Sequence, residues 1–350
     1  MKKKLISAIL CTALAVSMLA GCGSSSSTTT SSTEETEEEA AEEETAEAEE
    51  ETVETGEAKT IAYITPSTTT PFWNWVQDGI EAQAAEAGYT VQVYDSENDS
   101  ATQLKNAQNA ITAGVDAIII SPTDSASCPA VQEEAEAADI PVVICDIGTD
   151  EGTYLTMVST PNYDGAYEVG EYLAQYLIEN GMEGSVGEIT IPLSRINGQN
   201  RDQGFQDALA EYGFEVTTVL EGPEQTMDEA DQKARNIVTA NPDLVAIFAN
   251  YDQATLGTEA ALEDLGLEGQ VLIASFDGNP DIVEDLQSGK VLVCGAQQAK
   301  KMGKESVNAL VSFFAGEEVD EEIFVPTLLL TADNVEDYLD VIEEDICGLD

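Results

Sequence analysis

The segment Thr68-Thr69-Thr70-Pro71-Phe72-Trp73 follows a short apolar run, Ile61-Ala62-Tyr63-Ile64. The apolar run predicts a buried strand, and Pro71 is typical of the first turn of a helix, where the N–H that proline lacks would have no intrahelical partner. In an open α/β sheet, ligands bind beyond the carboxyl ends of the strands. We therefore expect Thr70, Phe72 and Trp73 at the rim of a ligand crevice. The alternative is that the two rings serve only as core packing.

The same strand-then-helix unit recurs along the chain from Lys59 onward. Apolar runs that predict strands lie at 61–64, 90–94, 117–120, 142–145, 186–191, 216–220, 244–249, 271–276, 292–295 and 324–330. Helical patterns lie at 73–87, 101–113, 130–138, 165–179, 201–212, 229–240, 254–265, 280–287 and 300–314. This alternation indicates parallel sheets, and the nearly continuous apolar strands indicate helices on both sheet faces. Two half-chains of this pattern predict an α/β fold with two similar, Rossmann-like lobes.

The N-terminal part differs from the rest. Met1-Lys2-Lys3-Lys4 and the apolar stretch 5–19 form a secretory signal pattern that ends in Leu19-Ala20-Gly21-Cys22. That tetrapeptide resembles a bacterial lipobox, which implies cleavage before Cys22 and acylation of its sulfur. The alternative is an ordinary secretory signal with an incidental cysteine. We predict a lipoprotein signal peptide at 1–21 and a disordered acidic tether at 22–57, so that the chain is anchored to a membrane without spanning it.

Charge and composition exclude several classes of protein. The chain has 350 residues with 68 acidic and 13 basic side chains, a net charge of −55 and no histidine. This balance argues against binding to nucleic acid and against docking on anionic lipid through surface charge. Histidine, the commonest general base and metal ligand in proteins, is therefore absent. Neither a Gly-x-Gly-x-x-Gly pattern nor a Gly-Lys-Ser/Thr loop occurs, so we expect no nucleotide, no metal and no other cofactor.

The cysteines beyond Cys22 are widely spaced and form no Cys-x-x-Cys pair, which argues against a zinc site. We expect Cys145 and Cys294, inside strand runs, to be small buried hydrophobic residues. The sequence does not pair Cys128, Cys145, Cys294 or Cys347 in disulfides.

Polar side chains follow several predicted strands at their carboxyl ends, and an arginine opens a predicted helix. They are Asp146, Asn250, Tyr251, Asp277, Gln297 and Arg201. Carboxylates accept hydrogen bonds from vicinal hydroxyls, an arginine fork donates to others, and an aromatic face covers the C–H side of a sugar ring. Together these groups predict a site for a small polyhydroxylated ligand. Taken singly, Asp146 and Asp277 have an alternative role as helix N-caps, and Arg201 as a surface residue.

Motifs in the region 59–333 resemble, in their order, the sugar-binding type I periplasmic binding proteins, with ribose- and galactofuranose-binding proteins nearest in pattern. They are Pro71-Phe72-Trp73, Ser121-Pro122-Thr123-Asp124, Ile140-Pro141-Val142, Asn200-Arg201-Asp202-Gln203-Gly204-Phe205, Phe276-Asp277-Gly278 and Ala296-Gln297. The resemblance implies two lobes, joined by a three-segment hinge, that close around a sugar. It places the crossings near 160–161, 297–298 and 325–326, which gives lobes of 58–160 plus 298–325 and 161–297 plus 326–350.

By the same resemblance, Phe72 and Trp73 stack on the sugar ring, and the side chains of Asp146, Arg201, Asp277 and Gln297 bond its hydroxyls. Some positions depart from the ribose-binding pattern. Ile147 and Tyr251 stand where Arg and Asn are usual, Thr70 replaces a common Asn, and Glu224-Gln225-Thr226 lacks the aromatic ring that would cover the second sugar face. These departures leave the identity of the sugar open.

The resemblance implies an extracytoplasmic, lipid-anchored protein that captures a monosaccharide by hinge closure and delivers it to an ABC transporter permease. We expect a monomer without enzymatic activity. Delivery to a sensor receptor is an alternative, and a glycosidase that uses Asp146 and Asp277 as a carboxylate pair is another. A DNA-binding regulator of the same fold is excluded, because a signal segment and an acidic tether stand where its helix-turn-helix would be needed.

Overall fold

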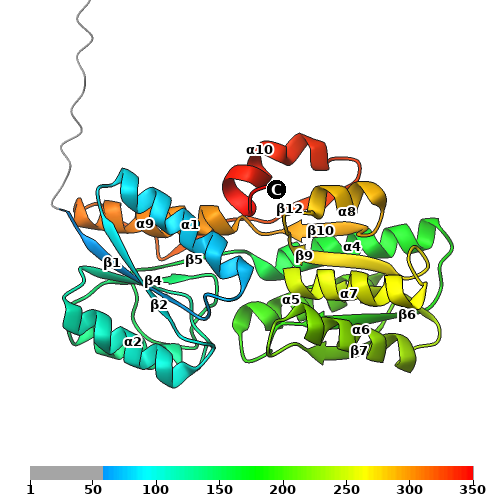
Figure 1. The fold of residues 1–350 in the computed structure, drawn as a ribbon, viewed down its shortest axis with the longest axis horizontal. Coiled ribbons are helices and arrows are strands. Elements are labelled where there is room, and N and C mark those ends of the chain that lie inside the picture. The colour runs from blue at the N-terminus through cyan, green and yellow to red at the C-terminus, as the bar shows by residue number, and fades with distance from the viewer. Residues whose placement is uncertain (1–57, 350) are drawn as a thin grey trace, which may run out of the picture. The chain divides into compact units, whose positions relative to one another are not determined.

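A computed structural model of the chain describes residues 58–349, so the predicted signal peptide, Cys22 and the tether lie outside the described residues. The described part contains two six-stranded sheets, each covered by helices on both faces (Figure 1). We call the sheet that contains β1, together with the helices packed on it, the N-lobe. The second sheet and its helices are the C-lobe. The prediction of two α/β lobes with mostly parallel strands is confirmed.

The N-lobe sheet has the strand order β11-β5-β4-β3-β1-β2, and all its neighbouring strands are parallel. Residues Ile61 and Tyr63 of β1 belong to the hydrophobic cluster under α1 and α9, whereas Ala62 and Ile64 belong to the cluster under α2 and α3. This alternation follows from the pleat of a strand. The N-lobe elements are β1 (Thr60–Thr65), α1 (Pro71–Glu86), β2 (Thr90–Asp95), α2 (Ser100–Ala113), β3 (Ala117–Ile120), α3 (Cys128–Glu136), β4 (Val142–Cys145), β5 (Thr156–Ser159), α9 (Ala299–Phe314) and β11 (Glu322–Phe324).

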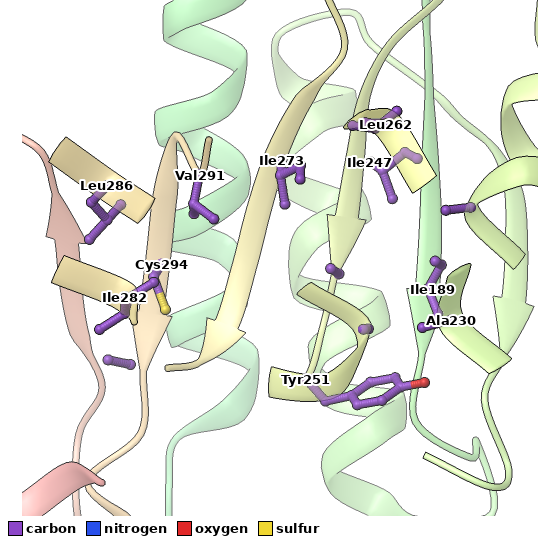
Figure 2. Close-up of a cluster of buried hydrophobic side chains, with 14 of the residues drawn as sticks. Ile189, Ala230, Ile247, Tyr251, Leu262, Ile273, Ile282, Leu286, Val291 and Cys294 are labelled. Carbon is purple, nitrogen blue, oxygen red and sulfur yellow. The ribbon is translucent and has the colours of Figure 1, made fainter. Parts of the chain in front are cut away.

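The C-lobe sheet has the order β12-β10-β9-β8-β6-β7, and β12 alone among its strands runs antiparallel to its neighbour. Helices α4 and α5 cover one face, and α6, α7 and α8 cover the other (Figure 1). Figure 2 shows the apolar cluster of the second face. The C-lobe elements are α4 (Asn162–Glu179), β6 (Ser185–Thr190), α5 (Ile196–Glu211), β7 (Val216–Glu221), α6 (Met227–Ala240), β8 (Leu244–Ala249), α7 (Asp252–Leu265), β9 (Leu272–Asp277), α8 (Ile282–Ser288), β10 (Val293–Ala296) and β12 (Leu328–Thr331).

The predicted strand at 324–330 is wrong as a single element. The structure has β11 in the N-lobe sheet and β12 in the C-lobe sheet, with Pro326 between them. Proline lacks the N–H that a continuous central strand would donate, so the chain leaves one sheet before it and joins the other after it. Helix α5 begins at Ile196, five residues before the predicted start. The sequence analysis did not predict β5 or the short C-terminal helices, which are a 3-10 helix (Val335–Tyr338), α10 (Leu339–Val341) and a π-helix (Ile342–Ile346).

The chain passes between the lobes after β5, after β10 and after β11, which are the three connections among the described residues. Within residues 58–349, no helix is both long enough and apolar enough to cross a bilayer. Cys145 and Cys294 are fully buried, as expected, and neither they nor Cys128 forms a disulfide with a described residue.

Candidate ligand-binding site

A small cavity lies at the carboxyl ends of strands from both sheets. Its walls meet closely and leave a cavity volume of about 20 Å³, room for about one water molecule. Its lining mixes three aromatic rings, two arginines and three aspartates. The lining residues are Thr70, Phe72, Trp73, Asp146, Ile191, Arg195, Asn197, Arg201, Gln225, Tyr251, Asp252 and Asp277.

The N-lobe contributes an aromatic wall from the first turn of α1. Thr70 is the N-cap residue and keeps an extended backbone, and its carbonyl accepts a hydrogen bond from the Trp73 N–H at 3.1 Å. Phe72 and Trp73 meet edge to face, with ring centroids 4.9 Å apart. Both rings also belong to the N-lobe core. Core packing therefore fixes the same rings that line the cavity, so a role in the core does not exclude contact with a ligand.

Arg201 lies deep in the C-lobe wall and is 2% exposed, which excludes a surface position. Its Nε donates to Asn162 Oδ1 at 2.7 Å, and its Nη1 donates to the Asn250 carbonyl at 2.8 Å. The same Nη1 lies 3.0 Å from Asp277 Oδ1, and the guanidinium sits 4.3 Å from the centroid of the Phe276 ring. These contacts hold the arginine in one orientation, as a buried charge requires.

Asp277 ends β9 and lies opposite the Arg201 guanidinium. Its Oδ1 also accepts a hydrogen bond from Gln297 Nε2 at 2.6 Å. Burial raises the pKa of the Asp277 carboxyl, and the charge of Arg201 opposes that rise. Gln297 is fully buried behind Asp277 and is not part of the cavity lining. The structure therefore brings the predicted site residues Asp277 and Gln297 together, with only Asp277 in the cavity wall.

Asp146 follows β4 on the N-lobe side. Its Oδ2 accepts a hydrogen bond from Asn197 Nδ2 at 2.9 Å, whereas its buried Oδ1 has no hydrogen-bond partner among the described residues. Burial raises the pKa of Asp146 to about 6 even though Arg201 lowers it. The next element after Asp146 is the strand β5, and the N-cap of α8 is Asp281. The helix-cap alternative for Asp146 and Asp277 is therefore wrong.

Asp146 and Asp277 share an unusual backbone conformation, with φ of 68° and 78°. Aspartate tolerates this left-handed region better than most residues, but the conformation still carries a cost. Non-glycine residues held in this way concentrate at binding and catalytic sites. The two lobes thus present a carboxylate in the same manner after corresponding strands, β4 and β9.

The structure separates Asn250 from Tyr251. The Asn250 side chain points into the C-lobe, where it donates to Glu188 and Thr190 and accepts from the Ile191 N–H. Its carbonyl, not its amide, contacts Arg201. Tyr251 lines the cavity with its ring, which extends toward Ile189 and Ala230 (Figure 2). A Cβ on Gly222 would lie 2.2 Å from the Tyr251 hydroxyl, so that hydroxyl lies against the Gly222 backbone.

The sequence analysis assigned no ligand contact to four polar residues of the lining: Arg195, Asn197, Gln225 and Asp252. Arg195 and Arg201 are two of only three arginines in the chain, and both follow the end of one predicted strand. That scarcity was a usable signal for Arg195. Asp252 begins α7, and burial followed by the charge of Asp277 raises its pKa to about 7. Nothing in the sequence separates this aspartate from an ordinary residue of a first helical turn.

The two walls of the cavity are in direct contact. Arg195 Nε donates to the Thr123 carbonyl at 2.9 Å, and the Ile196 N–H donates to Ser125 Oγ at 3.0 Å. The Asn197–Asp146 hydrogen bond crosses between the same lobes. No group of three or more acidic or cysteine side chains in residues 58–349 is arranged to hold a metal ion. The arrangement is that of a closed, polar cavity with one aromatic wall.

Comparisons with known proteins agree with this geometry. Residues 61–318 match the family described as periplasmic binding protein domain. A ribose import binding protein of Bacillus subtilis is 30% identical over 265 residues, which cover 75% of this chain and 83% of that protein.

Solved structures of two solute-binding proteins of ABC transporters also match. One, from Actinobacillus succinogenes with bound D-allose, has a TM-score of 0.74 and 26% identity, over 80% of this chain and 100% of that one. The other, from Bacillus halodurans with bound myo-inositol, has a TM-score of 0.75 and 28% identity, over 83% of this chain and 100% of that one. The chain belongs to the periplasmic binding protein family.

Proposed function

We propose that this protein is the sugar-binding component of an ABC importer and that it captures a neutral monosaccharide or cyclic polyol in the cavity between its lobes. The relatives named above bind ribose, D-allose and myo-inositol, which share a compact carbon skeleton covered with hydroxyls. Because these relatives are binding proteins, we interpret Asp146 and Asp277 as hydrogen-bond acceptors for the ligand and not as a pair for glycoside hydrolysis.

The observation that carries this proposal is the unsatisfied polar group in the wall. Asp146 Oδ1 is buried and has no hydrogen-bond partner among the described residues. A buried acceptor left unpaired costs about 1–3 kcal/mol, and more when it is charged. A ligand hydroxyl that donates to this oxygen would remove that cost. The aromatic wall of Phe72 and Trp73 would cover the C–H face of the same ligand.

The residues divide into those that touch the ligand and those that hold them. We assign direct contact to Thr70, Phe72, Trp73, Asp146, Arg201, Tyr251 and Asp277, all in the lining. We assign Gln297 and Asn250 to positioning, because Gln297 bonds Asp277 and the Asn250 carbonyl bonds Arg201. A few hydrogen bonds to charged groups, each on the order of 1.5–3 kcal/mol, together with ring stacking, are enough for micromolar affinity, about −8 kcal/mol.

Binding and closure are one equilibrium in this proposal. A ligand shifts the lobes toward the closed form only by its differential affinity for the two forms. A sugar that contacts Asp146 in the N-lobe and Arg201 in the C-lobe has this property, because it makes both contacts only when the walls meet. We propose N-lobe boundaries of 58–160 plus 298–325 and C-lobe boundaries of 161–297 plus 326–350, which place the hinge in the three connections.

We further propose that the protein works outside the cytoplasm as a monomer, held to the membrane by a lipid on Cys22, and passes its ligand to a permease in that membrane. Support for the anchor comes from the lipobox-like segment Leu19-Ala20-Gly21-Cys22 and the acidic tether after it. Globomycin, an inhibitor of lipoprotein signal processing, should cause accumulation of the precursor. If the protein serves a receptor and not a permease, it still binds its ligand, but deletion of its gene leaves uptake of that ligand unchanged.

Tryptophan fluorescence tests the binding proposal, because Trp73 lines the cavity and Trp75 lies in the same helix. Titration with D-ribose, D-allose and myo-inositol should change the emission in a saturable manner with at least one of them. The Asp146→Asn variant should bind that ligand about tenfold or more weakly, since it loses a charged acceptor. No response to any neutral monosaccharide or cyclitol would contradict the proposal.

A further inference from the structure

Arg195 occupies an unusual position in the cavity wall. It is the N-cap residue of α5, is 4% exposed and lines the cavity. Its Nε donates across the lobe boundary to the Thr123 carbonyl at 2.9 Å, and its Nη1 donates to Gln225 Oε1 of its own lobe at 3.1 Å. The third nitrogen, Nη2, makes no hydrogen bond with a described residue. One side chain therefore bonds residues of both lobes and has one donor group, Nη2, that can bond a ligand.

The charge of Arg195 is also incompletely matched. No carboxylate among the described residues lies within ion-pair distance of its guanidinium. Burial lowers the pKa of Arg195 to about 10, and the charges of Asp146 and Asp124 oppose that change. The side chain therefore stays protonated at neutral pH. A buried guanidinium is stabilised only when its remaining donors find acceptors, and an oxygen of the ligand is the acceptor that a filled cavity would supply.

The walls around this group differ in character. The N-lobe wall carries the rings of Phe72 and Trp73. The C-lobe wall carries one ring, that of Tyr251, together with the Gln225 amide and the Arg195 guanidinium. Gln225 has a left-handed backbone, with φ of 49°, and its Oε1 accepts the hydrogen bond from Arg195 Nη1. Ile147, next to Asp146, is fully buried in the N-lobe core and offers no donor. A ligand between such walls needs one C–H face and one face that carries an accepting hydroxyl.

We propose that Arg195 contacts the ligand through Nη2, with Gln225 as its positioning residue, and selects sugars or cyclitols that present a hydroxyl on the face away from Phe72 and Trp73. This inference rests on the proposed function, because it names a hydroxyl pattern for the same cavity. An axial hydroxyl on a six-membered ring is the simplest group that meets this requirement. Arg195 also completes the contact between the lobes, so recognition of that hydroxyl and closure are coupled.

A comparison of deoxy ligands tests the inference. The first step identifies, by calorimetry on the wild-type protein, the tightest ligand among D-ribose, D-allose and myo-inositol. The second step measures its single-deoxy analogues with the wild type and with Arg195→Gln and Arg195→Lys. We expect one analogue to bind the wild type about ten- to a hundredfold more weakly, and this difference to vanish in Arg195→Gln. Arg195→Lys, which keeps a donor, should show part of the affinity difference between the ligand and this analogue.

Matched variants separate ligand contact from stability. Gln225→Ala should weaken the same selectivity without abolishing binding, and Arg235→Gln, on the surface of α6, should change nothing. Thermal unfolding of each variant shows whether it is folded. If Arg195→Gln keeps its affinity within twofold, or weakens every analogue by one common factor, Arg195 is only a contact between lobes and the inference is overturned. If the wild type binds no neutral monosaccharide or cyclitol at all, the proposed function fails as well.

Discussion

Arg201 and Asp277 illustrate how single residues set the chemistry of the cavity. Both are almost completely buried, and their charges lie 3.0 Å apart. Taking two charges out of water is costly, and their attraction compensates only when the remaining donors and acceptors are satisfied. Here Asn162, Asn250 and Gln297 supply those partners. Arg201 and Asp277 are therefore held in a fixed arrangement in the cavity wall.

Replacing Arg201 by methionine should destabilise the protein by about 3–5 kcal/mol, because Asp277 is left as a buried charge without its partner. The same change should abolish detectable sugar binding. Urea unfolding and calorimetry measure the two effects. The double variant Arg201→Met/Asp277→Asn should recover part of the stability but not the binding. A single variant within 1 kcal/mol of the wild type would contradict the role assigned to the pair.

Asp252 gives the stability of the protein a pH dependence of defined sign. Its folded-state pKa of about 7 lies above the ordinary value of 3.8, so the folded state binds this proton more tightly than the unfolded state. The free energy of unfolding should therefore decrease as pH rises from about 4 to about 7. Asp252→Asn removes this ionisation, and its stability relative to wild type should increase over that range by up to about 4 kcal/mol.

Urea unfolding at pH 5, 6, 7 and 8 checks this expectation, with Asp340→Asn, at an exposed position, as the control. A constant difference between Asp252→Asn and wild type over the whole range would show that Asp252 does not titrate there.

Which polar residues reach the cavity was only partly predictable from the sequence. Asp146, Arg201 and Asp277 follow or precede strong strand patterns, and the carboxyl ends of parallel strands meet at one sheet edge. Asn250 satisfies the same rule, yet its side chain turns inward to the buried Glu188. A strand-end position fixes where the backbone is and not which way the side chain turns. Contacts with residues distant in sequence decide that direction.

At the scale of elements, helices α1 and α9 approach each other unusually closely. A Cβ on Gly79 would lie 1.9 Å from the carbonyl oxygen of Lys300, and one on Gly303 would lie 2.2 Å from that of Val76. Only glycine at these positions allows such contact. Because α1 carries Phe72 and Trp73 at its first turn, this approach also fixes the aromatic wall of the cavity.

Gly79→Ala should lower the free energy of unfolding by about 1–3 kcal/mol, since the clash is with backbone and the helices must separate. The shift of α1 should also weaken ligand binding severalfold. Ala82→Ser, on the exposed side of the same helix, is the control and should change stability by less than about 0.5 kcal/mol. Equal stability of Gly79→Ala and wild type would mean that the two helices are not in tight contact.

The elements that the sequence predicted share strong local signals. Strands β3, β4 and β8 are continuous apolar runs, and their observed bounds equal the predicted ones. Strand β5, Thr156–Ser159, is short and half polar, so it lacked such a signal. The separation of β11 from β12 depends on which sheet each strand joins. That choice rests on contacts with β5 and β10, which local pattern does not contain.

At the scale of the whole molecule, the two lobes repeat one design. Each presents a carboxylate after a buried strand with the same left-handed backbone, Asp146 in one and Asp277 in the other. The cavity exists only where the lobes meet, and hydrogen bonds such as Arg195–Thr123 close it. A ligand that bridges these walls gains contacts only in the closed form, so affinity and closure must change together.

Calorimetric titration of the purified wild-type protein and of Arg201→Met with D-ribose, D-allose and myo-inositol tests this claim most directly. The account predicts single-site binding of at least one of them to the wild type at about micromolar strength, and no measurable binding to the variant. Absence of heat with every cyclic polyol, or equal affinity in the two proteins, would contradict it.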